Sequence, residues 1–195
     1  MQVETPHGPA RVHLHPVDEA RGTLVLGHGA GGGVTARDLV AATKAAHAAR
    51  FSVALVEQPY RVAGRKSPAP AAQLDAAWTS VVEQLDLGDL PLVTGGRSSG
   101  ARVACRTAPA TGSVGVLCLA FPVHPPGRPE KTRLDELDAV EVPVLIVQGE
   151  SDPFGMPPPG PNREIVTVPG NHSLRTGLDT LNTAVQGWLA VLAGG

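Results

Sequence analysis

The stretch Leu92-Val93-Thr94-Gly95-Gly96-Arg97-Ser98-Ser99-Gly100-Ala101-Arg102-Val103-Ala104 decides how the rest of the chain is interpreted. A short apolar run reaches two glycines, passes Ser98 and a further glycine, and continues as a helical pattern. This order predicts a sharp turn from a strand into a helix, with a strained serine raised above the carboxyl edge of a sheet. Gly96 and Gly100 fit such a turn because a Cβ at either position would collide with the neighbouring strand or helix. Ser98 is therefore a candidate nucleophile.

Size and composition are typical of a globular protein. The chain has 195 residues, of which 42% are hydrophobic and 17% charged, so we expect one domain over residues 1–195. A net charge of -2 gives no reason to expect a nucleic acid or an anionic membrane as partner. No apolar run approaches the ~20 residues of a membrane helix, and no basic-then-apolar signal opens the chain. These features predict a cytoplasmic location, and arginine in excess of lysine is typical of a GC-rich bacterial gene.

Cysteines and histidines provide no strong sign of a metal or redox site. Cys105 and Cys118 lack C-x-x-C spacing, so two reduced core thiols are favoured over a redox role. His13 and His15 share one face of a predicted strand and could hold a metal ion. Because no third ligand is near them in sequence, a solvated strand face is favoured. We expect no metal and no cofactor.

Apolar runs alternate with helical patterns along the chain. Residues 1–16 alternate loosely, which predicts an antiparallel edge strand or hairpin. Continuous apolar runs predict strands covered on both faces at residues 23–26, 51–56, 92–94, 114–121 and 142–147, with a last short strand at 164–168. Helical patterns occupy residues 37–49, 74–85 and 178–192 and the segment after Ser98. The predicted class is α/β, with a mostly parallel central sheet and helices on both faces.

Two proline-rich segments punctuate this pattern. Residues 122–138 are too short for a lipase-type cap, and residues 153–161 contain five prolines and cannot be a normal helix. The sequence therefore predicts a minimal cap or none.

The glycine-rich stretch Gly27-His28-Gly29-Ala30-Gly31-Gly32 allows two interpretations. It satisfies G-x-G-x-x-G after a strand, and Glu57 ends the next strand where a dinucleotide fold would bind ribose. Alternatively, backbone N–H groups of Ala30 or Gly31, together with that of Ser99, form an oxyanion hole.

Two downstream residues favour the oxyanion interpretation. A serine nucleophile needs a base, and the base needs an anion to hold its tautomer. Asp152 follows the strand at 142–147, and His172 lies between the last strand and the closing helix. Both are then at the carboxyl edge that carries Ser98, in the chain order serine, acid, histidine. Taken singly, Asp152 could begin a turn and His172 could be a loop residue. The other acids near strand ends, Glu57 and Glu150, are weaker candidates.

The whole chain resembles the α/β-hydrolases, and most of all the small, lid-poor members related to dienelactone hydrolases and testis-expressed hydrolase-like proteins. The resemblance runs from about Thr23 to the C-terminus and rests on His28-Gly29-Ala30-Gly31-Gly32, Gln58-Pro59-Tyr60, Gly95-Gly96-Arg97-Ser98, Phe121-Pro122-Val123-His124-Pro125-Pro126-Gly127, Gln148-Gly149-Glu150-Ser151-Asp152-Pro153-Phe154-Gly155 and His172-Ser173. It implies an α/β-hydrolase fold, with Ser98 as nucleophile, Asp152 as orienting acid and His172 as base. Relatives usually carry Met-Gly-Gly after the serine, where this chain has Ser99-Gly100-Ala101.

The function expected on these grounds is hydrolysis of a small carboxylic ester or thioester through an acyl-enzyme on Ser98. His28, Tyr60 and His124 are expected near the substrate because their loops reach the same sheet edge. For His124 a turn residue among prolines is an equally good interpretation. The alternative function is a catalytically silent interaction protein with the same fold, and the oligomeric state does not follow from the sequence.

Overall fold

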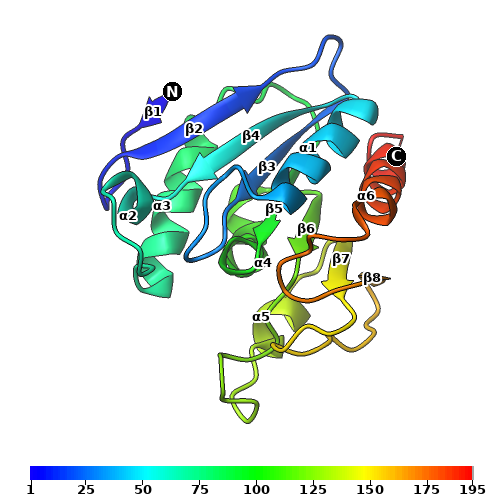
Figure 1. Ribbon diagram of the computed structural model, residues 1–195. Helices are drawn as coiled ribbons and strands as arrows, with labels where there is room; N and C mark the ends of the chain where they lie inside the picture. Colours follow the sequence, from blue (N-terminus) through cyan, green and yellow to red (C-terminus); the bar gives the residue numbers. More distant parts are fainter. Residues whose placement is uncertain (195) are drawn as a thin grey trace.

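The computed structural model describes residues 1–194 and contains one eight-stranded sheet with the strand order β1-β2-β4-β3-β5-β6-β7-β8 (Figure 1). Pairing is parallel from β4 through β3, β5, β6 and β7 to β8, whereas β2 is antiparallel to β1 and β4. The strands are β1 (Gln2–Val3), β2 (Ala10–His15), β3 (Gly22–Gly27), β4 (Phe51–Glu57), β5 (Leu92–Arg97), β6 (Gly115–Leu119), β7 (Val144–Gly149) and β8 (Arg163–Val168).

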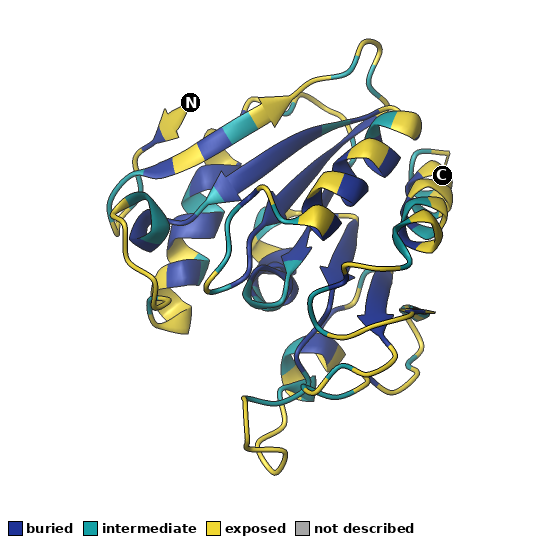
Figure 2. Cartoon of the chain, viewed as in Figure 1, coloured by how far each residue is buried: buried dark blue, intermediate teal, exposed yellow. Residues whose placement is uncertain are grey.

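Helices cover both faces of this sheet. They are α1 (Arg37–Ala48), α2 (Pro59–Val62), α3 (Ala71–Gln84), α4 (Ser99–Thr111), α5 (Leu134–Asp138) and α6 (Leu178–Leu192). α1 and α6 pack together over one face, and α3, α4 and α5 lie over the other (Figure 1). Every residue of β3, β6 and β7 is buried between these layers, which explains their continuous apolar sequences (Figure 2).

The predicted α/β class, the mostly parallel sheet and the absence of a cap are confirmed. Residues 122–138, where a cap would be inserted, hold only the five-residue helix α5. Within the described residues, no helix combines the length and apolar character needed to cross a bilayer. Cys105 and Cys118 are buried free thiols whose Sγ atoms lie 3.6 Å apart, as the core interpretation predicts.

Two local expectations differ from the structure. Leu14 continues the apolar alternation of β2, yet 55% of its surface is exposed. The core cluster that covers Ala10 and Val12 from the α3 side does not extend as far as Leu14. The basic, proline-punctuated stretch at residues 61–70 predicts a surface loop, but it begins inside α2, which starts with Pro59 at its first position. Proline suits that position because its fixed φ matches the helix and its missing N–H is not needed there.

Candidate active site

The elbow, which we define as residues 96–100, turns β5 into α4 at Ser98. Ser98 has φ 52° and ψ −105°, a strained conformation for a residue with a side chain. A Cβ added to Gly96 or to Gly100 would lie 2.4 Å from the carbonyl oxygen of Gly27 at the end of β3. The predicted reason for these two glycines is thus confirmed, because only hydrogen atoms fit against β3 at both positions.

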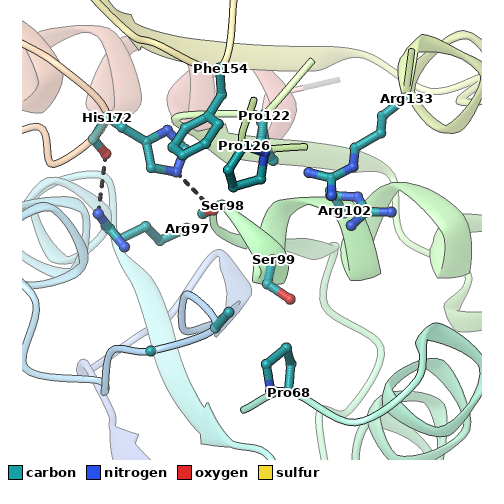
Figure 3. Close-up of a pocket in the computed structure, with 12 residues that line it drawn as sticks. Pro68, Arg97, Ser98, Ser99, Arg102, Pro122, Pro126, Arg133, Phe154 and His172 are labelled. Atoms are coloured by element: carbon teal, nitrogen blue, oxygen red, sulfur yellow. Dashed lines mark hydrogen bonds between the residues drawn. The ribbon is translucent and has the colours of Figure 1, made fainter. Parts of the chain in front are cut away.

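The His172 ring lies between Ser98 and Asp152. Its Nε2 is 2.8 Å from the Ser98 Oγ (Figure 3), and its Nδ1 is 2.8 Å from Oδ2 of Asp152. Because the carboxylate accepts a hydrogen bond from Nδ1–H, Nε2 carries no proton and can accept that of the serine hydroxyl. The structure therefore brings together the three residues that the sequence singles out, while Glu57 and Glu150 stay outside this chain of contacts.

A buried hydrogen-bond network holds the Asp152 carboxylate. Its side chain is 1% exposed, its Oδ1 accepts the Phe154 N–H at 2.9 Å, and its Oδ2 accepts Nε2 of Gln148 at 2.8 Å. Gln148 is fully buried in β7 and also donates to the Gly155 carbonyl at 2.9 Å. The sequence analysis did not single out Gln148, although an amide at the end of an apolar strand is a usable signal.

Arg97 joins three parts of the site. Its Nε lies 2.9 Å from Oδ2 of Asp38, a fully buried carboxylate on α1, and its Nη2 donates to the His172 carbonyl at 3.1 Å (Figure 3). Its Nη1 packs against Gly29 so closely that a Cβ added to that glycine would lie only 2.6 Å away. Burial raises the pKa of Asp38, and the positive charge of Arg97 opposes that rise. This pair was not predicted from the sequence, where its signals are an arginine beside the nucleophile and an aspartate on an apolar helix face.

The glycine loop, residues 27–33, faces Ser98 from β3. Its Gly32 N–H donates to the Gly29 carbonyl at 3.1 Å and closes a turn over Ala30 and Gly31. Within residues 1–194, the N–H groups of Ala30 and Gly31 donate no hydrogen bond, and Tyr60 fixes the loop by donating to the Ala30 carbonyl at 2.7 Å. Ser99 opens α4, where a helix leaves its N–H groups without internal partners. The predicted donors Ala30, Gly31 and Ser99 therefore lie around Ser98 in one pocket.

The structure does not bring His28, Tyr60 or His124 into that pocket. His28 is buried, its Nδ1 donates to the Gly29 carbonyl at 2.8 Å, and its Nε2 accepts the Gln58 N–H at 3.1 Å. Burial lowers the pKa of His28, in keeping with a neutral ring that supports the loop.

Tyr60 and His124 also have structural contacts. The Tyr60 ring meets the His28 ring edge-on with centroids 5.8 Å apart, and burial raises the pKa of Tyr60 to about 12. Nδ1 of His124 lies 3.0 Å from the Pro125 carbonyl, as in the turn interpretation of this residue. All three positions were expected near substrate because their loops reach the right edge, but their side chains turn toward the protein.

The pocket over Ser98 has a volume of about 340 Å³ and combines apolar walls with cationic side chains. The ring of Phe154 meets that of His172 edge-on, with centroids 4.4 Å apart. The lining residues include three arginines and no acid: Ala30, Gly31, Pro68, Arg97, Ser98, Ser99, Arg102, Pro122, Pro126, Arg133, Phe154 and His172 (Figure 3).

The features of a dinucleotide site do not come together. α1 begins at Arg37, beyond the glycine loop, so no helix N-terminus directly follows these glycines to face a pyrophosphate. Glu57, the candidate ribose ligand, lies 3.6 Å from Arg11 and 3.2 Å from His13. Among residues 1–194, no three or more His, Cys, Asp or Glu side chains are grouped as metal ligands would be.

Comparison with known proteins places the chain among hydrolases. Residues 20–175 match the family model described as an alpha/beta hydrolase domain. A search of curated proteins gives no match.

Solved structures share the fold over nearly the whole chain. A lidless α/β serine hydrolase from Xanthomonas campestris is similar with a TM-score of 0.79 and 19% identity, covering 98% of this chain and 93% of that one. An α/β serine hydrolase homologue from Coxiella burnetii has a TM-score of 0.79 and 17% identity, covering 97% and 96%. A dienelactone hydrolase from Anabaena variabilis has a TM-score of 0.69 and 15% identity, covering 100% and 94%. At these identities the likeness concerns the fold.

Proposed function

The chain belongs to the alpha/beta hydrolase family, and we propose that it hydrolyses small carboxylic esters or thioesters through an acyl-enzyme on Ser98. The observation that supports this most is the His172 ring, which is 2.8 Å from both the Ser98 Oγ and the Asp152 carboxylate. A catalytic base needs this geometry, since one nitrogen must reach the nucleophile while the other is held by an anion.

In the proposed acylation step, the Ser98 Oγ attacks the ester carbonyl while Nε2 of His172 takes the hydroxyl proton. Asp152 stabilises the resulting imidazolium without taking a proton itself. The negative charge on the tetrahedral oxygen is met by N–H groups of Ser99 and of the Ala30–Gly31 segment. The imidazolium then gives its proton to the departing alcohol or thiol, which leaves an ester on Ser98.

Deacylation repeats these steps with water as the nucleophile. His172 takes a proton from water, the hydroxide attacks the acyl carbonyl, and the Ser98 oxygen leaves with the proton from His172. In sum, one ester and one water become one carboxylic acid and one alcohol. The absence of a cap over the pocket agrees with small substrates that reach Ser98 directly from solution.

The proposal is tested by labelling with a fluorophosphonate and by turnover of p-nitrophenyl acetate and butyrate. In Ser98→Ala and His172→Ala we expect labelling to vanish and kcat to fall by about 10⁴-fold or more. Ser151→Ala and His7→Ala are matched controls, because both residues are exposed and their side chains lie outside the pocket. A folded wild-type protein that neither labels nor turns over would instead favour the catalytically silent interaction protein.

A further inference from the structure

The cations of the pocket are unequally neutralised. Arg97 is paired with Asp38, and Arg102 on α4 donates through its Nε to Glu136 of α5 at 2.7 Å. Arg106 donates to Asp75 at 2.8 Å and lies 3.1 Å from Glu136. Within residues 1–194, Arg133 has no carboxylate within 4.0 Å of its guanidinium, although it lines the pocket.

Arg133 therefore adds a positive charge that the surrounding protein does not balance. Arg102 and Arg106 pair with the two carboxylates Asp75 and Glu136, and Arg133 is a third guanidinium with no ion-pair partner among residues 1–194. Partial burial, and then the nearby charge of Arg102, lower the pKa of Arg133. A guanidinium in this setting gains from an anion that arrives with the substrate, because an anion offsets both the lost hydration and the repulsion.

Figure 3 shows the guanidinium groups of Arg133 and Arg102 close to each other, on the side of Ser98 away from His172. The Arg102 contacts to Glu136 use its Nε and Nη2, which leaves Nη1 without a partner in the described part of the chain. Arg133 makes one long side-chain hydrogen bond, from its Nη1 to the His124 carbonyl at 3.5 Å. Nη1 of Arg102, and Nε and Nη2 of Arg133, are thus without a partner among residues 1–194 and can bind one carboxylate.

The position of the Arg102 and Arg133 guanidinium groups relative to His172 indicates which part of a bound ester would lie next to them. His172 must protonate the leaving oxygen, so the alcohol or thiol lies on the His172 side of the attacked carbon. An acyl chain that points away from His172 would extend toward Arg102 and Arg133 (Figure 3). Pro122 and Pro126 line the same pocket, and their apolar rings suit a short methylene chain.

We infer that this site prefers acyl groups ending in a carboxylate, so that its substrates are half-esters or half-thioesters of short dicarboxylic acids, with Arg133 as the specificity-determining residue. The inference rests on the proposed function, since it takes Ser98 as the attacking group. Hydrolysis of such a half-ester consumes one water and gives the free dicarboxylate and the alcohol.

The test compares esters that differ only in the terminal group: monoethyl adipate with ethyl hexanoate, and monoethyl glutarate with ethyl pentanoate. We expect the wild-type kcat/KM to be higher for the anionic ester in at least one pair. In Arg133→Gln the anionic-to-neutral ratio should fall by about 10- to 100-fold, the range for a lost hydrogen-bonded charge contact. Arg133→Lys should restore part of the ratio.

Arg128→Gln is the matched control, because Arg128 is an exposed arginine of the same segment outside the pocket lining. It should leave the ratio within about 2-fold of wild type. An unchanged ratio in Arg133→Gln, or a wild-type preference for the neutral ester at both lengths, would overturn the inference.

A binding measurement separates this inference from the proposed function. Monoethyl adipate is titrated into Ser98→Ala and into Ser98→Ala/Arg133→Gln, so that no turnover is needed. Binding weakened about 10-fold or more in the double variant supports the anion subsite even if the wild-type protein proves inactive. Equal binding by the two variants, or none by either, overturns the subsite even if neutral esters are hydrolysed.

Discussion

Two glycine-rich stretches lie beside Ser98, and they differ in how closely other atoms pack against their glycines. In the elbow, a Cβ on Gly96 or Gly100 would lie 2.4 Å from the Gly27 carbonyl. In the glycine loop, a Cβ on Gly31 or Gly33 would meet no atom within 4 Å. The elbow glycines are required because the backbones of β3 and α4 touch there. Nothing packs against the outer glycines of the loop, and one of them, Gly31, lines the pocket with an N–H that donates no hydrogen bond within residues 1–194.

This difference in packing shows that glycine serves two purposes at one site, one in the elbow and one in the glycine loop. Close packing fixes the height and direction of Ser98, while open space leaves the oxyanion side accessible to substrate. Arg97 connects the two stretches, since it belongs to the elbow and its side chain packs on Gly29 of the loop.

The largest effect is expected for Arg97→Met, which removes the residue that joins the stretches. The variant leaves Asp38 buried and unpaired, and breaking such a pair costs about 3–5 kcal/mol of unfolding free energy. The cost should shrink from pH 7 to pH 5. Because the pKa of Asp38 is raised in the folded state and rises further without Arg97, the folded protein binds the extra proton as the pH falls.

Urea denaturation at both pH values measures this prediction. Adding Asp38→Asn to Arg97→Met should recover part of the lost stability, because no buried charge is then left unpaired. A deficit that is equal at pH 5 and pH 7 and unaffected by Asp38→Asn contradicts this explanation.

The next largest effect is expected for Gly100→Ala, which forces a Cβ against the carbonyl of Gly27. Overpacking of this kind lowers the unfolding free energy by about 1–3 kcal/mol, and the shift of α4 should also slow fluorophosphonate labelling of Ser98. Gly187→Ala on α6 is the matched control, since its Cβ would meet no atom. There the same substitution should stabilise the helix by up to about 1 kcal/mol. Equal effects in the two helices would remove the distinction between packed and open glycines.

A moderate effect is expected from His28 as the pH falls. Because burial lowers its folded-state pKa below the reference value of 6.5, the unfolded chain binds a proton that the folded protein does not. The contribution of His28 to stability should decrease below pH 6.5, by at most about 1.4 kcal/mol per pH unit. Unfolding of wild type and His28→Gln between pH 7 and pH 5 measures it. The variant should lose less stability over this range, whereas the exposed-residue control His7→Gln should behave as wild type.

The smallest effect is expected for Gly33→Ala in the glycine loop. With no clash and no positive φ at this position, alanine restricts the unfolded chain and raises the unfolding free energy by about 0.4–1 kcal/mol. Thermal unfolding measures the change. A loss of more than 1 kcal/mol would mean that the loop is packed as tightly as the elbow.

The sheet was predictable from sequence because β3, β6 and β7 are buried on both faces and therefore read as unbroken apolar runs. The elbow was predictable because few residue types fit a strand that turns directly into a helix. The positions of Asp152 and His172 followed from chain order, since both come at the carboxyl ends of parallel strands. Their catalytic roles, like that of Ser98, remain predictions.

Side-chain direction at the sheet edge was not predictable. His28 lies on the right loop, but its ring turns inward because Gly29 and Gln58 hydrogen-bond both of its nitrogens. The Arg97–Asp38 pair joins residues of β5 and α1 that no local pattern connects. The free guanidinium of Arg133 is likewise visible only after Arg102 and Arg106 have been assigned their carboxylate partners.

The contact of one carbonyl, that of Gly27, with both Gly96 and Gly100 has a consequence for directed evolution. Neither glycine can be exchanged without displacing the end of β3, so each single substitution lowers stability. A Cβ on Gly31 or Gly33 would meet no atom within 4 Å, so a library randomised at these positions would vary the glycine loop while leaving the Ser98 turn intact. Substitutions that seek new activities therefore cost least stability in the glycine loop and most in the elbow.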